Sequence, residues 1–168
     1  MEPEDAEFMF EAENEEAAWI YSDYLAPLSM EMLRQYAMTY DADPLRSGQL
    51  RLVVDVDGRP VGMADIFDIS ARHLHAMTGI YILPDMRSKG VGAEALRLLC
   101  EYCRTRLGMH ILCAIIAERN QAARKCYRSA GFIASGILPQ WLREGDYYNN
   151  AIFMVRKIDI NEQRYLNN

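Results

Sequence analysis

The sequence predicts a mixed α+β fold built as one domain, and two observations lead to this prediction. The chain has 168 residues, which is enough for one domain with a sizeable core and short for two. Its apolar residues follow helical spacing in some segments and strand alternation in others, in the order helices, hairpin, strand, helix, strand, helix, hairpin. This order favours one sheet covered by helices.

The first third of the chain is predicted to be helical and to carry an apolar face. Its candidate core residues are Phe8, Ala12, Trp19 and Ile20 in the first part, then Met30, Leu33 and Ala37. The Asp-Ala-Asp-Pro stretch at 41–44, followed by Ser47 and Gly48, marks a loop because these residue types favour turns.

A β-hairpin is the clearest prediction in the middle of the chain. Alternating apolar residues from Leu50 to Val56 lead to Asp57 and Gly58, a pair that favours a tight hairpin turn. Apolar residues at 61, 63, 66 and 69 form the returning strand. A short apolar strand is then expected at 80–83, ending at Pro84.

The rest of the chain is predicted to form a helix, a strand, a second helix and a final hairpin. The helix at 92–107 ends at Gly108, which suits the left-handed residue after a helix. A buried strand at 110–117 and a helix at 120–130 follow, and Gly131 closes that helix. Strands at 133–142 and 148–155 then flank a turn at 144–146.

Acidic residues are concentrated at the start of the chain. Residues 1–16 contain eight Asp or Glu and no Lys or Arg, whereas the whole chain carries a net charge of −6. This stretch would repel a phosphate backbone, so no nucleic-acid partner is expected. Two interpretations stay open for it: a solvated helix face, or a field that attracts a cationic amine substrate.

The chain is expected to stay in the cytoplasm and away from membranes. Its longest apolar run of note, residues 111–117, is far shorter than the roughly 18 residues that a spanning helix needs. The N-terminus reads Met-Glu-Pro-Glu-Asp and lacks the positive start and apolar stretch of a secretory signal.

The cysteines are predicted to be structural. Cys100 and Cys103 form a C-x-x-C motif, but they share helical spacing with neighbouring leucines, which puts both thiols on a buried helix face. No second C-x-x-C or H-x-x-x-H completes a zinc set, so no metal site is expected. His73 and His75 lack such partners and are expected at the surface.

The segment R-S-K-G-V-G at 87–92 lies between a predicted strand and a predicted helix. A helix N-terminus offers unpaired N–H groups and partial positive charge, which suit a pyrophosphate. Gly90 and Gly92 allow close approach of the backbone, and Arg87 and Lys89 add positive charge at the rim. The spacing excludes a P-loop and a dinucleotide-binding fingerprint. Taken alone, the motif fits an ordinary strand-to-helix turn equally well.

A second block of residues gives this loop a family context. Asn120, Ala123, Tyr127, Gly131 and Phe132 read N-x-x-A-x-x-x-Y-x-x-x-G-F across the second helix and its exit. With Ile-Leu-Pro at 82–84 and the R-x-x-G-x-G loop, the block resembles the GCN5-related N-acetyltransferases (GNAT), over roughly residues 50–156. The closing segment at 144–154 is similar to the branch that holds spermidine and ribosomal-protein N-terminal acetyltransferases.

The resemblance implies a fold and a cofactor. The implied fold is a single domain with a mixed, mostly antiparallel sheet flanked by helices, in which a splayed pair of strands holds acetyl-CoA, the acyl donor. Residues 1–49 would form a helical acceptor-side region, 50–156 the sheet and cofactor core, and 157–168 a C-terminal tail.

The resemblance also implies which residues bind the cofactor. The backbone of Ile80, Tyr81 and Ile82 would bond to the pantetheine arm while the side chains serve the core. The pyrophosphate would be held by Arg87, Ser88, Lys89, Gly90, Val91, Gly92 and Ala93. Asn120 and Ala123 would contact the cofactor arm, although Asn120 suits a plain helix N-cap equally well.

Tyr127 is the implied catalytic acid, which would donate to the sulfur as CoA leaves. The alternative is a tyrosine half-packed against the sheet. Relatives in this branch often carry a glutamate base seven positions before the proline of the loop, but Met77 stands at that position here. The base is left unassigned: the other candidates, each better suited to a surface position, are Asp65, Asp68, His75 and Glu118.

The resemblance implies an N-acetyltransferase that moves an acetyl group from acetyl-CoA to a primary amine by direct attack. The acceptor would be a polyamine, a small amine or a protein N-terminus. Two alternatives stay open: a non-catalytic acyl-CoA-binding sensor, or a structural or partner-binding domain. A first strand that the family usually has is not evident, so the sheet edge would be open or covered by a subunit of a homodimer or higher homo-oligomer.

Overall fold

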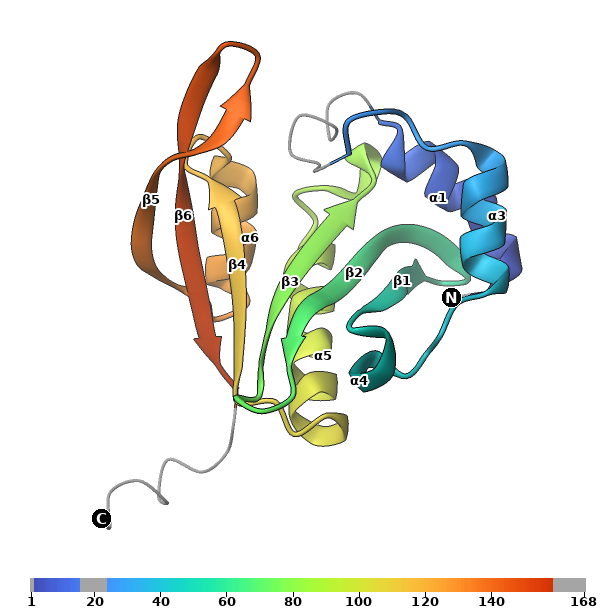
Figure 1. Ribbon diagram of the computed structural model, residues 1–168, viewed down its shortest axis with the longest axis horizontal. Helices are drawn as coiled ribbons and strands as arrows, with labels where there is room; N and C mark the ends of the chain where they lie inside the picture. The colour runs from blue at the N-terminus through green and yellow to red at the C-terminus, as the bar shows by residue number, and fades with distance from the viewer. Residues whose placement is uncertain (1, 16–23, 159–168) are drawn as a thin grey trace.

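Figure 1 shows the computed structural model of the chain, which describes residues 2–15 and 24–158. Its helices are η1 (Pro3–Asp5), α1 (Ala6–Glu13), α3 (Met30–Met38), α4 (Pro44–Ser47), η2 (Pro84–Met86), α5 (Val91–Arg106) and α6 (Gln121–Ser129). Its strands are β1 (Leu50–Val56), β2 (Arg59–Ser70), β3 (His75–Ile82), β4 (Ile111–Ala117), β5 (Ile133–Glu144) and β6 (Tyr147–Lys157). The predicted core residues Trp19 and Ile20 lie outside the described residues.

The six described strands form one mixed sheet, as the sequence predicts, in the order β1-β2-β3-β4-β6-β5. Every neighbouring pair is antiparallel except β3 and β4, which run parallel. The turn at Asp57 and Gly58 is confirmed, because both residues have positive φ angles of 54° and 81°. Such angles match the twist of a two-residue hairpin turn.

Different helices pack against the two faces of the sheet. Met63 and Ala64 are neighbours on β2 and therefore point to opposite faces. Ala64 belongs to the main core under α5, whereas Met63 packs with α1 and α3 in a second cluster. Figure 1 shows α5 and α6 on one side and α1 and α3 near the end of β2 and β3.

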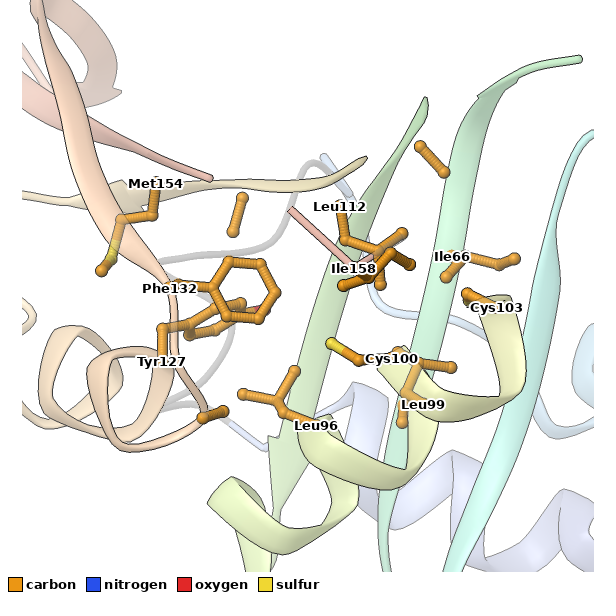
Figure 2. Packing of buried hydrophobic residues seen from close by; sticks show 14 of the residues in the cluster. Ile66, Leu96, Leu99, Cys100, Cys103, Leu112, Tyr127, Phe132, Met154 and Ile158 are labelled. Atoms are coloured by element: carbon orange, nitrogen blue, oxygen red, sulfur yellow. The ribbon is translucent and has the colours of Figure 1, made fainter. Parts of the chain in front are cut away.

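The main core explains the apolar face of α5. Figure 2 shows Leu96, Leu99, Cys100 and Cys103 of this helix pointing toward the sheet, where each is at most 2% exposed. The predicted burial of the C-x-x-C thiols is thus confirmed. Within the described residues, no group of three His, Cys, Asp or Glu side chains is placed to hold a metal ion.

Three predicted segments differ from the structure. The strand expected at 80–83 begins earlier, at His75, because β2 extends to Ser70 and pairs with it there. A short helix, α4, replaces part of the loop expected at 41–48; Asp43 caps it and Pro44 occupies its first turn. The final hairpin is longer than predicted and turns at Gly145 and Asp146.

The acidic N-terminal segment is only partly a solvated helix face. Glu4, Glu7 and Glu11 are exposed, as that interpretation requires. Glu13 instead pairs with Arg51 on β1, and Glu15 pairs with Arg87 after β3. The end of α1 is therefore tied to the sheet by charge as well as by apolar packing.

Candidate active site

The central feature of the site is a gap between two parallel strands. β3 and β4 pair at only three positions, from His75 with Ile111 to Met77 with Cys113. Beyond Met77 the strands diverge, which Figure 1 shows as a V between β3 and β4. Among the described strands, the segment from Thr78 to Ile82 pairs only with β2, so it presents an unpaired strand edge inside the sheet. The splay that the resemblance implies is present, and Ile80, Tyr81 and Ile82 lie on it.

The N-terminus of α5 lies at the end of this strand edge and has no side-chain cap. Its N-cap residue is Gly90, at φ 88°, and the first backbone bond of the helix runs from Glu94 N–H to Gly90 C=O over 3.0 Å. The N–H groups of Val91, Gly92 and Ala93 thus precede the first helical bond. Unpaired N–H groups and the helix dipole make this end a suitable place for a phosphate.

The two glycines of the loop serve different purposes. Gly90 needs a left-handed backbone, and a Cβ built there would meet no atom within 4 Å. At Gly92 a Cβ would lie 2.9 Å from Cys126 Sγ and 3.4 Å from a side-chain carbon of Ile82. From the sequence, both glycines were expected to allow close approach of a phosphate. The structure shows that Gly92 is also required for close packing of α5 against β3 and α6.

The basic residues of the loop are placed unequally. Lys89 is exposed, and its Nζ lies 3.9 Å from Met86 Sδ. Arg87 is held more firmly: its Nε donates to Ile82 C=O at 2.7 Å and its Nη2 donates to Glu15 at 2.8 Å. Ser88, between them, has a left-handed φ of 61°, which turns the chain toward the helix.

Tyr127 reaches from α6 to the vertex of the splay. Its hydroxyl donates to Thr78 C=O at 3.0 Å, and its ring packs edge-on against Phe132 with centroids 5.0 Å apart. Burial raises the pKa of this phenol well above its usual value, so the hydroxyl stays protonated. The ring is fully packed, at 3% exposure, rather than half-packed as the alternative interpretation supposed.

Asn120 is the N-cap of α6. Its side-chain oxygen accepts from the N–H of Ala123 at 3.0 Å, which is the usual capping bond. Of the two roles that the sequence left open for Asn120, the cap is therefore observed in this structure. A contact of Asn120 or Ala123 with a cofactor stays a prediction.

The candidate bases already have partners or lie on the surface. Asp65 accepts two hydrogen bonds from Arg51, at 2.9 and 2.8 Å. Glu118 accepts from the Asn150 amide at 3.0 Å beside a cleft of about 350 Å³ at the start of α6. Asp68 and His75 are both exposed.

Two polar groups near the splay were missed by sequence reasoning. Thr78 is 3% exposed, and its hydroxyl has no hydrogen-bond partner among the described residues. Glu15 accepts from the Tyr81 hydroxyl at 2.8 Å as well as from Arg87. Glu15 could not be singled out from seven other acids in the same stretch, and Thr78 shows no motif; only three-dimensional contacts identify them.

Comparisons with known proteins agree with this geometry. The family model described as acetyltransferase (GNAT) family matches residues 7–132. The spermidine N(1)-acetyltransferase of Escherichia coli is 28% identical over 157 residues, which is 92% of this chain and 81% of the relative. An L-methionine sulfoximine/L-methionine sulfone acetyltransferase of Pseudomonas aeruginosa is 32% identical over 80 residues, 48% of this chain and 46% of the relative.

Solved structures show the same fold. The spermidine N-acetyltransferase of Vibrio cholerae in complex with CoA and spermine has a TM-score of 0.80 and 21% identity, covering 94% of this chain and 92% of that chain. A dodecameric structure of the Vibrio cholerae enzyme has a TM-score of 0.76 and 22% identity, covering 94% of this chain and 90% of that chain. Among residues 2–15 and 24–158 no helix has the length and apolar character that a membrane span needs. With its splayed strands, its uncapped α5 and the family match over most of its length, the chain belongs to the acetyltransferase (GNAT) family.

Proposed function

We propose that this acetyl-CoA-dependent N-acetyltransferase acts on a primary amine of a polyamine such as spermidine. The observation that supports acetyl-CoA as the acyl donor is the splay of β3 and β4 beyond Met77, which leads directly to the uncapped end of α5. The assignment of a polyamine as the acceptor is supported by the 28% identity to the Escherichia coli spermidine N(1)-acetyltransferase over 92% of this chain. Amines of this class are cationic, and the exposed carboxylates of α1 would attract them.

The residues of the splay fit acetyl-CoA. The unpaired edge of Ile80, Tyr81 and Ile82 offers backbone groups to the amides of the pantetheine arm. The loop from Arg87 to Ala93 would hold the pyrophosphate through its N–H groups, and the space at Gly90 is open to receive it. Asn120 and Ala123 would flank the cofactor from the start of α6.

Acetyl-CoA supplies the activated acyl group, and the chain supplies position and charge. Tyr127 would donate a hydrogen bond to the departing sulfur. Because burial raises the pKa of its phenol, full proton transfer to a thiolate is uphill, so hydrogen bonding rather than complete transfer is its expected role. To donate, the hydroxyl must leave or share the carbonyl of Thr78.

We also propose a cytoplasmic homo-oligomer. Cys100, Cys103, Cys113 and Cys126 are all free thiols, which suits a reducing compartment. Large apolar side chains of β5 are exposed, including Ile133 at 68% and Trp141 at 57%, and a second subunit would cover them.

The acceptor is tested by a screen with the full chain, in which release of free CoA is followed with a thiol reagent. Spermidine and spermine are compared with methionine sulfone, an aminoglycoside and a peptide with a free N-terminus. The polyamines should give the highest kcat/KM. If another amine is acetylated and neither polyamine is, the assignment of a polyamine acceptor is wrong. Binding of acetyl-CoA without acetylation of any amine would favour the sensor hypothesis.

A further inference from the structure

The contact between Glu15 and Arg87 joins the N-terminal helices to the loop at 87–93. Glu15 follows the end of α1, where Asn14 exchanges two hydrogen bonds with Leu28, at 3.0 and 2.9 Å. These bonds fix the backbone next to Glu15. The carboxylate therefore meets Arg87 from a fixed position rather than from a loose arm.

In this structure Arg87 occupies a group that the cofactor is expected to use. Its Nε donates to the carbonyl of Ile82, the last residue of the unpaired edge proposed for pantetheine. Its Nη2 donates to Glu15, although Arg87 belongs to the loop that is proposed to bind the pyrophosphate. Cofactor contacts and the present contacts of Arg87 thus compete with each other.

Glu15 depends on Arg87 for charge balance. Its side chain is 20% exposed, and its described partners are Arg87 and the Tyr81 hydroxyl, each at 2.8 Å. Glu13, the neighbouring carboxylate, is already paired with Arg51. If Arg87 leaves, Glu15 keeps one neutral donor, and a partly buried carboxylate in that position favours a new cation.

The ring of Tyr81 adds a second attraction for a cation. The guanidinium of Arg87 lies over this ring, 5.6 Å from its centroid. When the guanidinium moves, the ring face and the carboxylate become available together. A protonated amine satisfies both, because an ammonium donates to a carboxylate and is attracted to an aromatic face.

We propose that Glu15 and the pyrophosphate of acetyl-CoA compete for Arg87, and that Glu15, once released, binds an ammonium group of the polyamine. This inference rests on the proposed function, because it needs both the cofactor and a cationic acceptor. It makes acetyl-CoA the first substrate to bind, since the acceptor site forms only after Arg87 has moved.

The first test measures the Kd of acetyl-CoA by calorimetry with the full chain at low ionic strength. Glu15→Gln keeps the shape of the side chain but weakens its hold on Arg87, so acetyl-CoA should bind about two- to fivefold tighter. Glu101→Gln removes the same charge from an exposed position in the second half of α5 and should leave the Kd unchanged. In an Arg87→Ala background, the effect of Glu15→Gln should vanish.

The second test measures the KM for spermidine at saturating acetyl-CoA. Glu15→Gln should raise this KM about tenfold, because a charged hydrogen bond is lost, while Glu101→Gln should not. If Glu15 had a purely structural role, Glu15→Gln would weaken the binding of acetyl-CoA and of spermidine together. Tighter binding of acetyl-CoA with a higher KM for spermidine therefore distinguishes the proposed role from a structural one.

Two results would contradict the proposed competition between Glu15 and the pyrophosphate for Arg87. Unchanged or weaker acetyl-CoA binding by Glu15→Gln, in a wild type that binds acetyl-CoA and acetylates spermidine, would reject this inference and leave the proposed function standing. A wild type that binds no acetyl-CoA would reject both.

Discussion

The N-termini of α5 and α6 make an informative comparison. Both helices follow a strand of the same parallel pair, β3 for α5 and β4 for α6. At α6 the side chain of Asn120 caps the helix by accepting from Ala123 N–H. At α5 the cap position is Gly90, which has no side chain to offer. The N-terminus of α6 is capped by its own side chain, whereas the N-terminus of α5 has no side-chain cap, which suits the proposed binding of a phosphate there.

The difference teaches where each helix contributes to the site. In the proposed site α5 would contribute its N-terminus, which no side chain of the described residues caps. α6 would contribute the side chain of Tyr127, while its own N-terminus is capped by Asn120.

The largest expected effect comes from the side chain of α6. Tyr127→Phe keeps the ring against Phe132 and removes the hydroxyl that reaches Thr78. If this hydroxyl assists departure of the sulfur by hydrogen bonding, kcat should fall by about 10²- to 10³-fold. The Kd of acetyl-CoA should stay within about twofold, since a lost side-chain hydrogen bond costs the fold only about 1 kcal/mol. Single-turnover rates and calorimetry measure the two quantities.

Tyr148→Phe is the matched control, because Tyr148 is 59% exposed on β6. It should alter neither quantity. Equal rates for Tyr127→Phe and wild type would remove Tyr127 from the mechanism and leave α6 with a structural role alone.

The next effect concerns the open end of α5. Gly90→Asp puts a carboxylate where the pyrophosphate is proposed to lie, and aspartate is among the residues that tolerate a left-handed φ. Repulsion of the phosphates should weaken acetyl-CoA binding by about tenfold to a hundredfold. Gly90→Asn has nearly the same shape without the charge and should bind more tightly than Gly90→Asp. Equal affinities of the two variants would show that no phosphate lies at this helix end.

The two helix ends also show which features of the structure can be predicted from the sequence. The loop at α5 and the cap at α6 each depend on residues that are close together in the sequence. The loop was predicted, and the cap was one of two roles left open for Asn120. The start of β3 at His75 was missed, because it is set by pairing with β2 across a turn. The pair of Glu15 and Arg87 joins residues 72 positions apart, and nothing local in either segment indicates its partner.

Local signals can also be present and overlooked. Asp43 followed by Pro44 is a cap followed by a first-turn proline, which favours a helix start as well as a loop. The loop prediction for 41–48 considered only the turn-forming tendency of these residues. The splay itself has no local signal in the strands, and it was anticipated only through the family resemblance.

The smallest expected effect decides the role of Asn120. Asn120→Ala removes the cap of α6 and should lower the free energy of unfolding by about 1 kcal/mol, measured by urea denaturation. If the cap is its whole role, the Kd of acetyl-CoA will not change. Asn120→Asp keeps a capping oxygen and should retain most of the stability. Weaker acetyl-CoA binding by Asn120→Ala, at a concentration where the variant is fully folded, would show that α6 also offers its start to the cofactor, and the contrast between the two helix ends would narrow to a difference in degree.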